Sequence, residues 1–255
     1  CRVIARYGVG VDNIDLEAAA ARQIYVTNVP EYCTEEVSDH TLALILNCLR
    51  KLTLRDRMIR KGFFESNIND SIHRSKEKVL GLIGYGKIAQ AVHRKWVGFS
   101  SHPVLITTRN QPTRIIPETQ VRFVDINSLL SAADIISLHL PLTPQTRHLL
   151  STEAFDRMKP GALLVNTSRG GLVDESALIE ALNSARLAAA GLDVFENEPL
   201  EFDHPLTRFS NVVLSSHVAW YSKEATVSLQ TEASQEVAKV LSGRRPMNWV
   251  NRWAQ

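Results

Sequence analysis

The chain has 255 residues, of which 44% are hydrophobic, and its formal net charge is +2. This length allows one large domain or two ordinary ones, with enough apolar side chains to form a substantial core. Because the basic residues form no long run, the charge gives no electrostatic case for a nucleic acid or a membrane surface, and we predict neither as a partner. No apolar run approaches the about 20 residues that cross a bilayer.

The three cysteines, Cys1, Cys33 and Cys48, show neither the spacing of a metal site nor the even number of a secreted disulfide framework. We therefore interpret them as free thiols in a reducing compartment and predict no metal site. The N-terminus also lacks the charged and apolar segments of a signal peptide. Together these features predict a cytoplasmic protein.

The chain begins at Cys1 without a methionine, and residues 1–6 (CRVIAR) already have the pattern of a buried strand leading into a glycine-rich turn. A natural domain rarely begins in the middle of a sheet. We therefore expect that further sequence precedes Cys1.

Two long helices are predicted, one from Thr34 to about Ile59 and one from Ser222 to about Ser242. Such helices could carry the chain from one lobe to another, so we place a hinge near each. The predicted domains are residues 1–47, part of a substrate-binding lobe; residues 48–226, a dinucleotide-binding Rossmann domain; and residues 227–255, a C-terminal helix and tail that return to the substrate lobe.

From Val79 onward, apolar runs of strand length alternate with segments of helical period. The runs are apolar throughout, as in strands that are buried on both faces. This alternation predicts an α/β fold with a doubly wound parallel sheet of the Rossmann type. The predicted strands are residues 79–83, 104–108, 121–124, 135–140, 162–167, 189–194 and 212–216. The predicted helix caps between them are Asp125, Ser151 and Asp174.

A glycine-rich segment follows the first of these strands and opens a helix, which is the context that the dinucleotide fingerprint G-x-G-x-x-G/A requires. Its glycines let the backbone turn tightly and approach a pyrophosphate, which then lies at the positive end of the helix. The alternative is a turn with no ligand. The segment consists of Gly84, Tyr85, Gly86, Lys87, Ile88 and Ala89.

The following strand should end in an acid about 20 residues further on, which would hold the ribose hydroxyls of NAD. Thr108 and Arg109 stand there instead, with Arg114 beyond, and no Asp or Glu occurs between Glu77 and Glu118. Hydroxyls and a guanidinium can bind a ribose phosphate, and no carboxylate repels it. We predict that NADP(H) is preferred and NAD(H) is possible. The alternative is that Arg109 is a solvated loop residue.

Three polar residues follow three predicted strands: Arg169, Glu198 and His217. The carboxyl ends of parallel strands meet at one edge of a sheet, so these residues form a candidate catalytic group. An arginine can grip a carboxylate through two parallel bonds, although a lone arginine is usually a surface residue. Reduction of a 2-keto acid needs a proton on oxygen, which histidine can donate, and a neighbouring carboxylate favours the charged imidazole.

The sequence resembles the D-isomer-specific 2-hydroxyacid dehydrogenase family, and within it the C-terminal-binding-protein branch and its bacterial relatives. The segment TTRNQPTR also resembles the NADP-preferring glyoxylate and hydroxypyruvate reductases. The motifs that carry the resemblance are RYGVGVDNID, NVPEYCTEEVSDH, GLIGYGKIA, HLPLTPQTRHL, NTSRGGLVDE, LDVFENEP and HVAWYS.

The resemblance implies a hydride transfer between a nicotinamide and a small D-2-hydroxy or 2-keto acid. Arg169 would orient the substrate, Glu198 would support the histidine, and His217 would be the acid/base. Further residues implied to line the cofactor are Leu140, Pro141, Thr146, Thr167, Ser168 and Asp193, the last near the nicotinamide amide.

The resemblance also places four residues at the substrate. Val9 and Gly10 would offer backbone amides to its carboxylate, while Arg6 and Trp220 would lie in its pocket. The alternatives are a core-facing turn for Val9 and Gly10 and a packed aromatic for Trp220.

Members of this family have additional βα units before the RYGVG segment, so the second lobe is predicted to be an incomplete flavodoxin-like lobe. The resemblance also suggests a homodimer through the nucleotide-binding lobe. Two other interpretations remain open: a dinucleotide-sensing, corepressor-like binding scaffold, and an inactive truncated relic.

Overall fold

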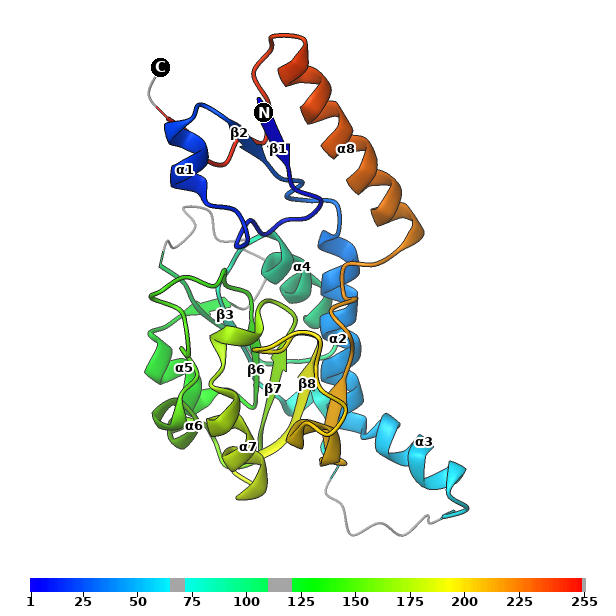
Figure 1. The fold of residues 1–255 in the computed structure, drawn as a ribbon. Coiled ribbons are helices and arrows are strands. Elements are labelled where there is room, and N and C mark those ends of the chain that lie inside the picture. The colour runs from blue at the N-terminus through cyan, green and yellow to red at the C-terminus, as the bar shows by residue number, and fades with distance from the viewer. Residues whose placement is uncertain (65–71, 110–120, 254–255) are drawn as a thin grey trace. The chain divides into compact units, whose positions relative to one another are not determined.

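The computed structural model describes residues 1–64, 72–109 and 121–253. The chain forms two compact units, a larger one of residues 37–219 and a smaller one of residues 1–36 and 220–255 (Figure 1). Within the described ranges, no helix is both long enough and apolar enough to cross a membrane.

The unit boundaries fall earlier in the chain than the predicted ones at residues 47 and 226. The reason lies in helix α2 (Thr34–Arg50), which crosses the first boundary. From Val37 onward this helix belongs to the larger unit, where Leu42 and Ile45 pack into the same core as the strands of the large sheet. Most of α2 is therefore a layer of the larger unit.

The larger unit contains a seven-stranded sheet in the order β5-β4-β3-β6-β7-β8-β9, in which every pair is parallel. The order reverses between β3 and β6, as in doubly wound Rossmann sheets, so the predicted fold class is confirmed. All the predicted strands are present; β8 begins and ends two residues earlier than predicted, and the others are slightly shorter than predicted. They are β3 (Leu80–Ile83), β4 (Val104–Thr107), β5 (Val121–Phe123), β6 (Ile135–Leu138), β7 (Ala162–Asn166), β8 (Leu187–Leu192) and β9 (Val212–Leu214).

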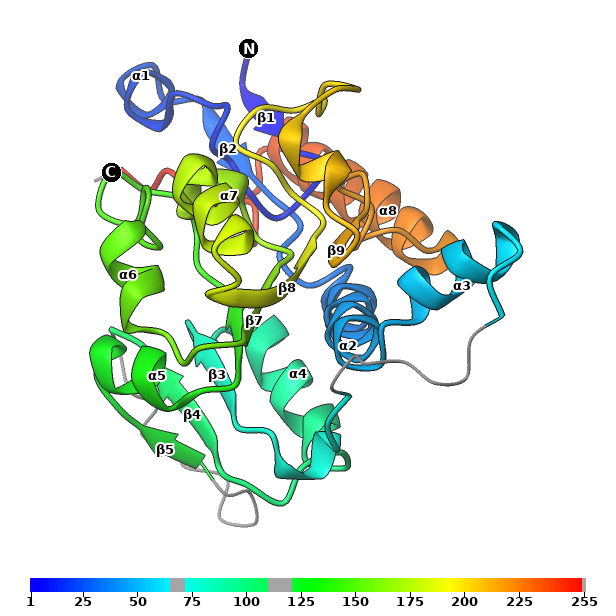
Figure 2. The same cartoon turned by 90° about the horizontal axis from the view of Figure 1, so that it is seen from below.

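Helices cover both faces of this sheet (Figure 2). One face packs against α2 and α4 (Lys87–Trp96), and Trp96 is fully buried in this core. The other face packs against α5 (Ile126–Ala132), α6 (Thr152–Arg157) and α7 (Glu175–Asn183), where Phe155 is buried. The chain also forms short 3-10 helices at Ser75–Glu77, Gly170–Leu172 and Pro205–Arg208.

The predicted helix caps differ in what their side chains bind. Asp125 accepts a hydrogen bond from the amide of Ser128, and Asp174 accepts from the amides that begin α7. Ser151 also precedes its helix, but its hydroxyl donates to the carboxylate of Glu153, so it satisfies no backbone amide. A side-chain cap stabilises a helix by about 1 kcal/mol.

The prediction of one continuous helix from Thr34 to about Ile59 is wrong. The helix α2 ends at Arg50, Lys51 is left-handed with φ 55°, and α3 (Leu52–Arg60) begins after it. Asn47 accounts for the break, because its side chain accepts from the amide of Thr53 at 2.9 Å and donates to the Thr53 hydroxyl at 2.7 Å. An asparagine side chain can replace helical backbone partners in this way.

The smaller unit contains a parallel pair of strands, β1 (Val3–Ala5) and β2 (Tyr25–Thr27), with α1 (Leu16–Ala21) and α8 (Lys223–Leu241) on either side in both views. The strand at the N-terminus and the helix α8 were predicted, and β2 was not. The C-terminal tail returns to β2, where the side chain of Asn251 accepts from the amide of Val26. That this unit is part of a flavodoxin-like lobe stays a prediction.

Candidate active site

The glycine-rich turn lies between β3 and α4, at the point where the strand order reverses. Gly84 has φ 96°, and a Cβ there would collide with the backbone oxygen of His139, so only glycine fits. Gly86 precedes α4 without a capping side chain, and a Cβ at Gly86 would meet nothing within 4 Å. Open space in front of first-turn amides suits a pyrophosphate, so these residues fit a dinucleotide cofactor.

The other residues of this turn are held by the protein. The Tyr85 hydroxyl is hydrogen-bonded to Nδ1 of His93 at 2.8 Å, and its ring meets Phe123 edge-on. Burial raises the pKa of Tyr85 and lowers the pKa of His93, so both are neutral near pH 7. Ile88 packs partly buried against the core, and Lys87 is exposed. Tyr85 therefore fixes the shape of the turn through His93.

The end of β4 carries the residues predicted to select the cofactor. Thr108 is half-buried and Arg109 is exposed, directly after the last strand residue Thr107. Arg114 lies outside the described residues. The two described residues thus stand at the carboxyl edge of the sheet, one strand away from the glycine-rich turn.

The loop after β6 contains three further predicted cofactor residues. Leu140 packs partly buried against the core, and Pro141 is exposed. The hydroxyl of Thr146 donates to the oxygen of Pro141 and accepts from the amide of Thr143, both at 2.8 Å. These bonds close the loop upon itself and fix its shape.

Beside this loop, the turn after β7 carries Thr167, Ser168 and Arg169. The Thr167 hydroxyl lies 2.9 Å from the hydroxyl of Thr41 on α2, and Ser168 donates to the oxygen of Leu138 at 2.6 Å. The Arg169 side chain is half-buried, and its Nη1 donates to the oxygen of Ser168. The structure thus fixes this turn to the neighbouring strand β6 and to α2.

The structure brings His217 and Glu198 together. Nδ1 of His217 lies 2.7 Å from Oε2 of Glu198, and the second oxygen of Glu198 accepts from the amide of Phe195 at 3.0 Å. The imidazole is 45% exposed, which leaves it accessible to a ligand. The pair borders a hollow of about 670 Å³, which is lined by Phe195, Glu198, Pro199, Leu200, Leu214, Ser215, Ser216 and His217.

Asp193 organises the turn that carries His217. Its carboxylate is fully buried and accepts from the Ser215 hydroxyl at 2.6 Å and from the amides of Val218 and Ala219. Its backbone oxygen accepts from the amide of His217, which has φ 55°. A left-handed backbone conformation at histidine costs on the order of 1 kcal/mol or more. The four hydrogen bonds that Asp193 accepts hold this turn in place.

Arg169 and Glu198 lie on turns that touch. A Cβ on Gly170 would collide with the backbone of Phe195, so the glycine after Arg169 is what allows the two turns to approach. All three candidate catalytic residues therefore lie on turns at the carboxyl edge of β7, β8 and β9.

Sequence reasoning missed several residues that build this site. His40 on α2 places Nε2 2.8 Å from the Ser215 hydroxyl and 3.6 Å from Asp193. Thr41 contacts Thr167, as described above. These polar residues lie on the buried side of a predicted helix, where each needs a hydrogen-bond partner. That need is the one signal in the sequence that could have identified them as part of the site.

The four residues predicted to bind substrate all lie in the smaller unit. The Arg6 guanidinium donates to the oxygen of Tyr7, and the oxygen of Val9 accepts from the Asn28 side chain. Gly10 stands next to Val9 in the same segment. Trp220 packs against a small core with Tyr32, as the alternative interpretation of a packed aromatic expects. The role of these four residues at a substrate stays a prediction.

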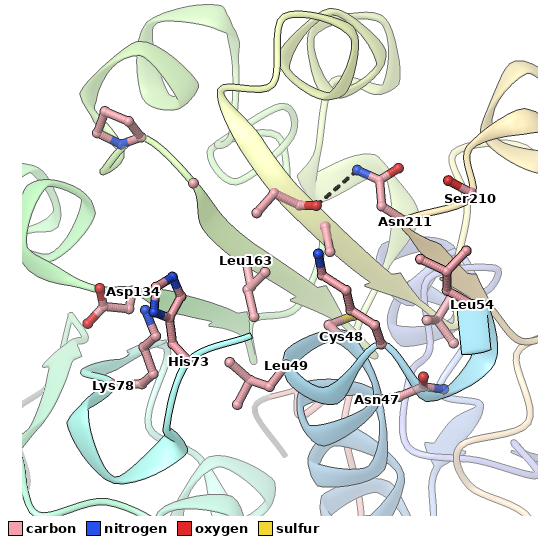
Figure 3. A pocket seen from close by; sticks show the side chains of 16 residues that line it. Asn47, Cys48, Leu49, Leu54, His73, Lys78, Asp134, Leu163, Ser210 and Asn211 are labelled. Carbon is pink, nitrogen blue, oxygen red and sulfur yellow. Dashed lines mark hydrogen bonds between the residues drawn. The ribbon is translucent and has the colours of Figure 1, made fainter. Parts of the chain in front are cut away.

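A second hollow lies at the opposite, amino edge of the large sheet (Figure 3). It measures about 450 Å³, and Figure 3 shows His73, Lys78 and Asp134 on one side and Ser210 and Asn211 on the other. Two of these polar groups bind the protein, since Asp134 accepts from the amide of Val79 and from Lys159, and Asn211 donates to a backbone oxygen. This hollow contains none of the predicted site residues.

The larger unit also matches a known family. The sequence model described as "D-isomer specific 2-hydroxyacid dehydrogenase, NAD binding domain" matches residues 42–219. The chain belongs to the D-isomer specific 2-hydroxyacid dehydrogenase family. It is thus a dehydrogenase of 2-hydroxy acids that uses a nicotinamide cofactor, and the predicted resemblance is confirmed.

Individual relatives of this dehydrogenase cover nearly all of it. A glyoxylate reductase of Thermofilum pendens is 39% identical over 98% of the chain and 75% of its own length. The structure of a D-lactate dehydrogenase with NAD+ from Lactobacillus jensenii has a TM-score of 0.86 at 29% identity, covering 98% of this chain and 79% of that one. An acyclic imino acid reductase in complex with NADPH and D-Arg has a TM-score of 0.85 at 32% identity, covering 98% and 78%.

Proposed function

We propose that this dehydrogenase transfers a hydride between NADP(H) and a small D-2-hydroxy or 2-keto acid, with His217 as the acid/base, Glu198 as its support and Arg169 as the residue that orients the substrate. The observation that carries this proposal is the 2.7 Å contact between His217 and Glu198 at the carboxyl edge of a dinucleotide-binding sheet. The bound nicotinamide supplies or accepts the hydride at the substrate C2.

Glu198 holds Nδ1 of His217, so Nε2 is the nitrogen that exchanges a proton with the substrate oxygen. In the reducing direction, Nε2 donates its proton to the oxygen as the hydride reaches carbon, and the new imidazole is neutral. The carboxylate of Glu198 stabilises the protonated imidazole before this step and fixes the plane of the ring. Because Glu198 also accepts from the amide of Phe195, its own orientation is fixed.

Arg169 binds the substrate carboxylate and polarises the adjacent carbonyl. A guanidinium can form two parallel hydrogen bonds to a carboxylate, which sets the face of the carbonyl that meets the cofactor. Its place directly after β7, beside the Glu198 turn, supports this role. In the smaller unit, Val9, Gly10, Arg6 and Trp220 are the residues that we propose to complete the substrate pocket.

Residues at the carboxyl edge of the sheet would hold the cofactor in this proposal. The glycine-rich turn holds the pyrophosphate, and Thr108 and Arg109 meet the ribose phosphate of NADP(H), because no carboxylate precedes them at the end of β4. Other turns at the same edge line the nicotinamide half, namely those of Leu140, Pro141, Thr146, Thr167, Ser168 and Asp193.

Turnover of NADPH with a panel of 2-keto acids tests this function. The panel covers small and bulky side chains with glyoxylate, hydroxypyruvate, pyruvate and phenylpyruvate. The consumption of NADPH is followed by the absorbance of the reduced nicotinamide. We expect steady turnover with at least one small acid, and formation of the D-hydroxy acid by chiral chromatography. Tight binding of NADPH without turnover of any acid would contradict the proposal and favour the binding scaffold. Neither binding nor turnover would favour the inactive relic.

We also propose that the dehydrogenase forms a homodimer through the larger unit. Helix α3 buries none of its residues, and Leu52, Ile59, Phe63 and Phe64 on and after it are exposed, Phe64 by 88%. Large apolar groups gathered on one segment commonly mark a protein contact. Sedimentation of the wild type and of Ile59→Glu tests this, with a dimer expected for the first and a monomer for the second. A monomeric wild type at micromolar concentration would contradict it.

A cytoplasmic location remains part of the proposal. All three cysteines lie in the described ranges and are free, as expected in a reducing compartment.

A further inference from the structure

The loop after β6 ends in a residue that touches both catalytic turns. The amide of His148 donates to the oxygen of Gly171, two residues after Arg169, at 2.8 Å. Its ring nitrogen Nε2 lies 2.7 Å from Oε1 of Glu196, two residues before Glu198. His148 has φ 51°, an uncommon conformation for a residue other than glycine. One residue therefore joins the turn of Arg169 to the turn of Glu198.

Glu196 anchors the turn that carries Glu198, because its carboxylate and its amide both bind other parts of the protein. Its Oε1 accepts from Nη2 of Arg147 at 2.6 Å as well as contacting His148, and its side chain is only 21% exposed. Its amide donates to Glu175 at 2.6 Å, and Glu175 lies 3.3 Å from Nε2 of His204. The backbone just before Glu198 is thus held by α7 through its amide and by the 147–148 segment through its carboxylate.

The two catalytic turns leave little room to move independently. Gly170 packs directly on the backbone of Phe195, whose amide in turn donates to Glu198. A small displacement of residues 195–198 would therefore change both the contact with the Arg169 turn and the position of the Glu198 carboxylate. A displacement of about 1 Å at a catalytic group can cost on the order of 100-fold in rate.

This inference rests on the roles proposed for Arg169, Glu198 and His217. We infer that Arg147 and His148 are positioning residues, which bind the carboxylate of Glu196 and thereby keep the side chain of Glu198 in its position relative to Arg169 and His217. Neither is predicted to touch substrate or cofactor. The competing interpretation is an ordinary surface ion pair, which would contribute a little stability and nothing specific to turnover.

Replacement of His148 separates these interpretations. His148→Ala is expected to lower kcat about tenfold, with the KM for NADPH changed less than twofold, because binding of the nucleotide does not depend on Glu198. His148→Gln keeps a side-chain amide that can donate to Glu196 and is expected to recover most of the lost kcat. The matched control is Lys159→Ala, which removes another partly exposed ion pair, with Asp134, at the amino edge and leaves kcat unchanged. An unchanged kcat in His148→Ala overturns the inference, and so does a loss that His148→Gln does not recover.

A double mutant tests whether His148 acts through Glu198. In the Glu198→Ala background, His148→Ala is expected to cost less than twofold further in kcat, whereas a full further tenfold loss overturns the inference. If Glu198→Ala itself leaves kcat unchanged, the proposed function has failed instead. Glu196→Ala leaves the left-handed residue in place and is expected to reproduce the effect if His148→Ala fails to fold.

A crystal structure of His148→Ala gives a readout that needs no activity. We expect the separation of Nδ1 of His217 and Oε2 of Glu198 to exceed hydrogen-bonding distance. If it stays near 2.7 Å, the inference is overturned.

Discussion

The two edges of the large sheet each have a hollow lined by polar side chains, and they differ in what those side chains are bonded to. At the carboxyl edge, the hollow of about 670 Å³ contains an exposed imidazole held by a carboxylate, on a left-handed turn that a buried aspartate fixes. At the amino edge, the hollow of about 450 Å³ contains an aspartate that is bonded to Lys159 and a backbone amide. Both hollows contain polar side chains, but an oriented and accessible acid/base pair lies only at the carboxyl edge among these two lined sets.

A large expected difference between the edges concerns their cations. Arg169→Ala is expected to lower kcat/KM by roughly 10²–10³, because the substrate loses its bidentate partner and the carbonyl its polarising charge. Lys78→Ala, which removes a cation from the amino edge, should leave kcat/KM within twofold. Steady-state kinetics with the best acid of the panel measures both. Equal losses would mean that the carboxyl edge is not the site of substrate binding.

The stability of the carboxyl edge should depend on pH through His139. Burial lowers the pKa of this histidine to about 4 from an ordinary value near 6.5. Below pH 6.5 the unfolded chain binds a proton that the folded chain does not, so stability is present above pH 6.5 and is lost as the pH falls toward 4. The loss from this group is on the order of 3 kcal/mol.

Urea unfolding from pH 7 to pH 4 measures this loss, with His139→Asn as the control that titrates nothing at this position. We expect the variant to lose less stability than the wild type across that interval. Parallel curves would show that His139 does not contribute.

The preference for NADPH over NADH tests the role proposed for the end of β4 at the carboxyl edge. Thr108→Asp introduces the acid that binds ribose hydroxyls and repels a ribose phosphate, so the ratio of kcat/KM for NADPH to that for NADH should fall at least about tenfold. Arg109→Ala should lower the same ratio less. A wild type that prefers NADH, or a ratio that neither change alters, would contradict the proposed preference.

The smallest expected effect concerns the thiol at the amino edge. Burial raises the pKa of Cys48 to about 12 and the pKa of Cys33 to about 11, so neither is a thiolate near pH 8. A thiol reagent should therefore modify the exposed Cys1 rapidly in the native protein and all three cysteines in guanidinium. Fast native labelling of Cys48 would show a chemically active amino edge.

Much of the larger unit could be predicted from the sequence because its strands are buried on both faces, which produces the unbroken apolar runs. The break at Lys51 could not be predicted from periodicity, since apolar residues continue at helical spacing through Leu49 and Leu52. Its cause is the side chain of Asn47, which a hydrophobic pattern does not include. The strand β2 is only three residues long and gave too short a signal.

The candidate site also has a part that could be predicted from the sequence and a part that could not. The predictable part stands in recognisable local contexts, and it consists of the glycine-rich turn, Arg169, Glu198 and His217. The supporting contacts join residues that are distant along the chain, such as His40 with Ser215 and His148 with Glu196, and no spacing rule relates them. They depend on the packing of α2 and of the loop after β6, which only coordinates supply.

The most direct test of the central claim compares two histidines, His217 at the carboxyl edge and His73 at the amino edge. General acid/base catalysis contributes about 10²–10⁴ in rate, so His217→Ala should lower kcat by that factor while NADPH still binds with unchanged affinity. His73→Ala should leave kcat within twofold. Turnover by His217→Ala at the wild-type rate would contradict the mechanism proposed for this dehydrogenase.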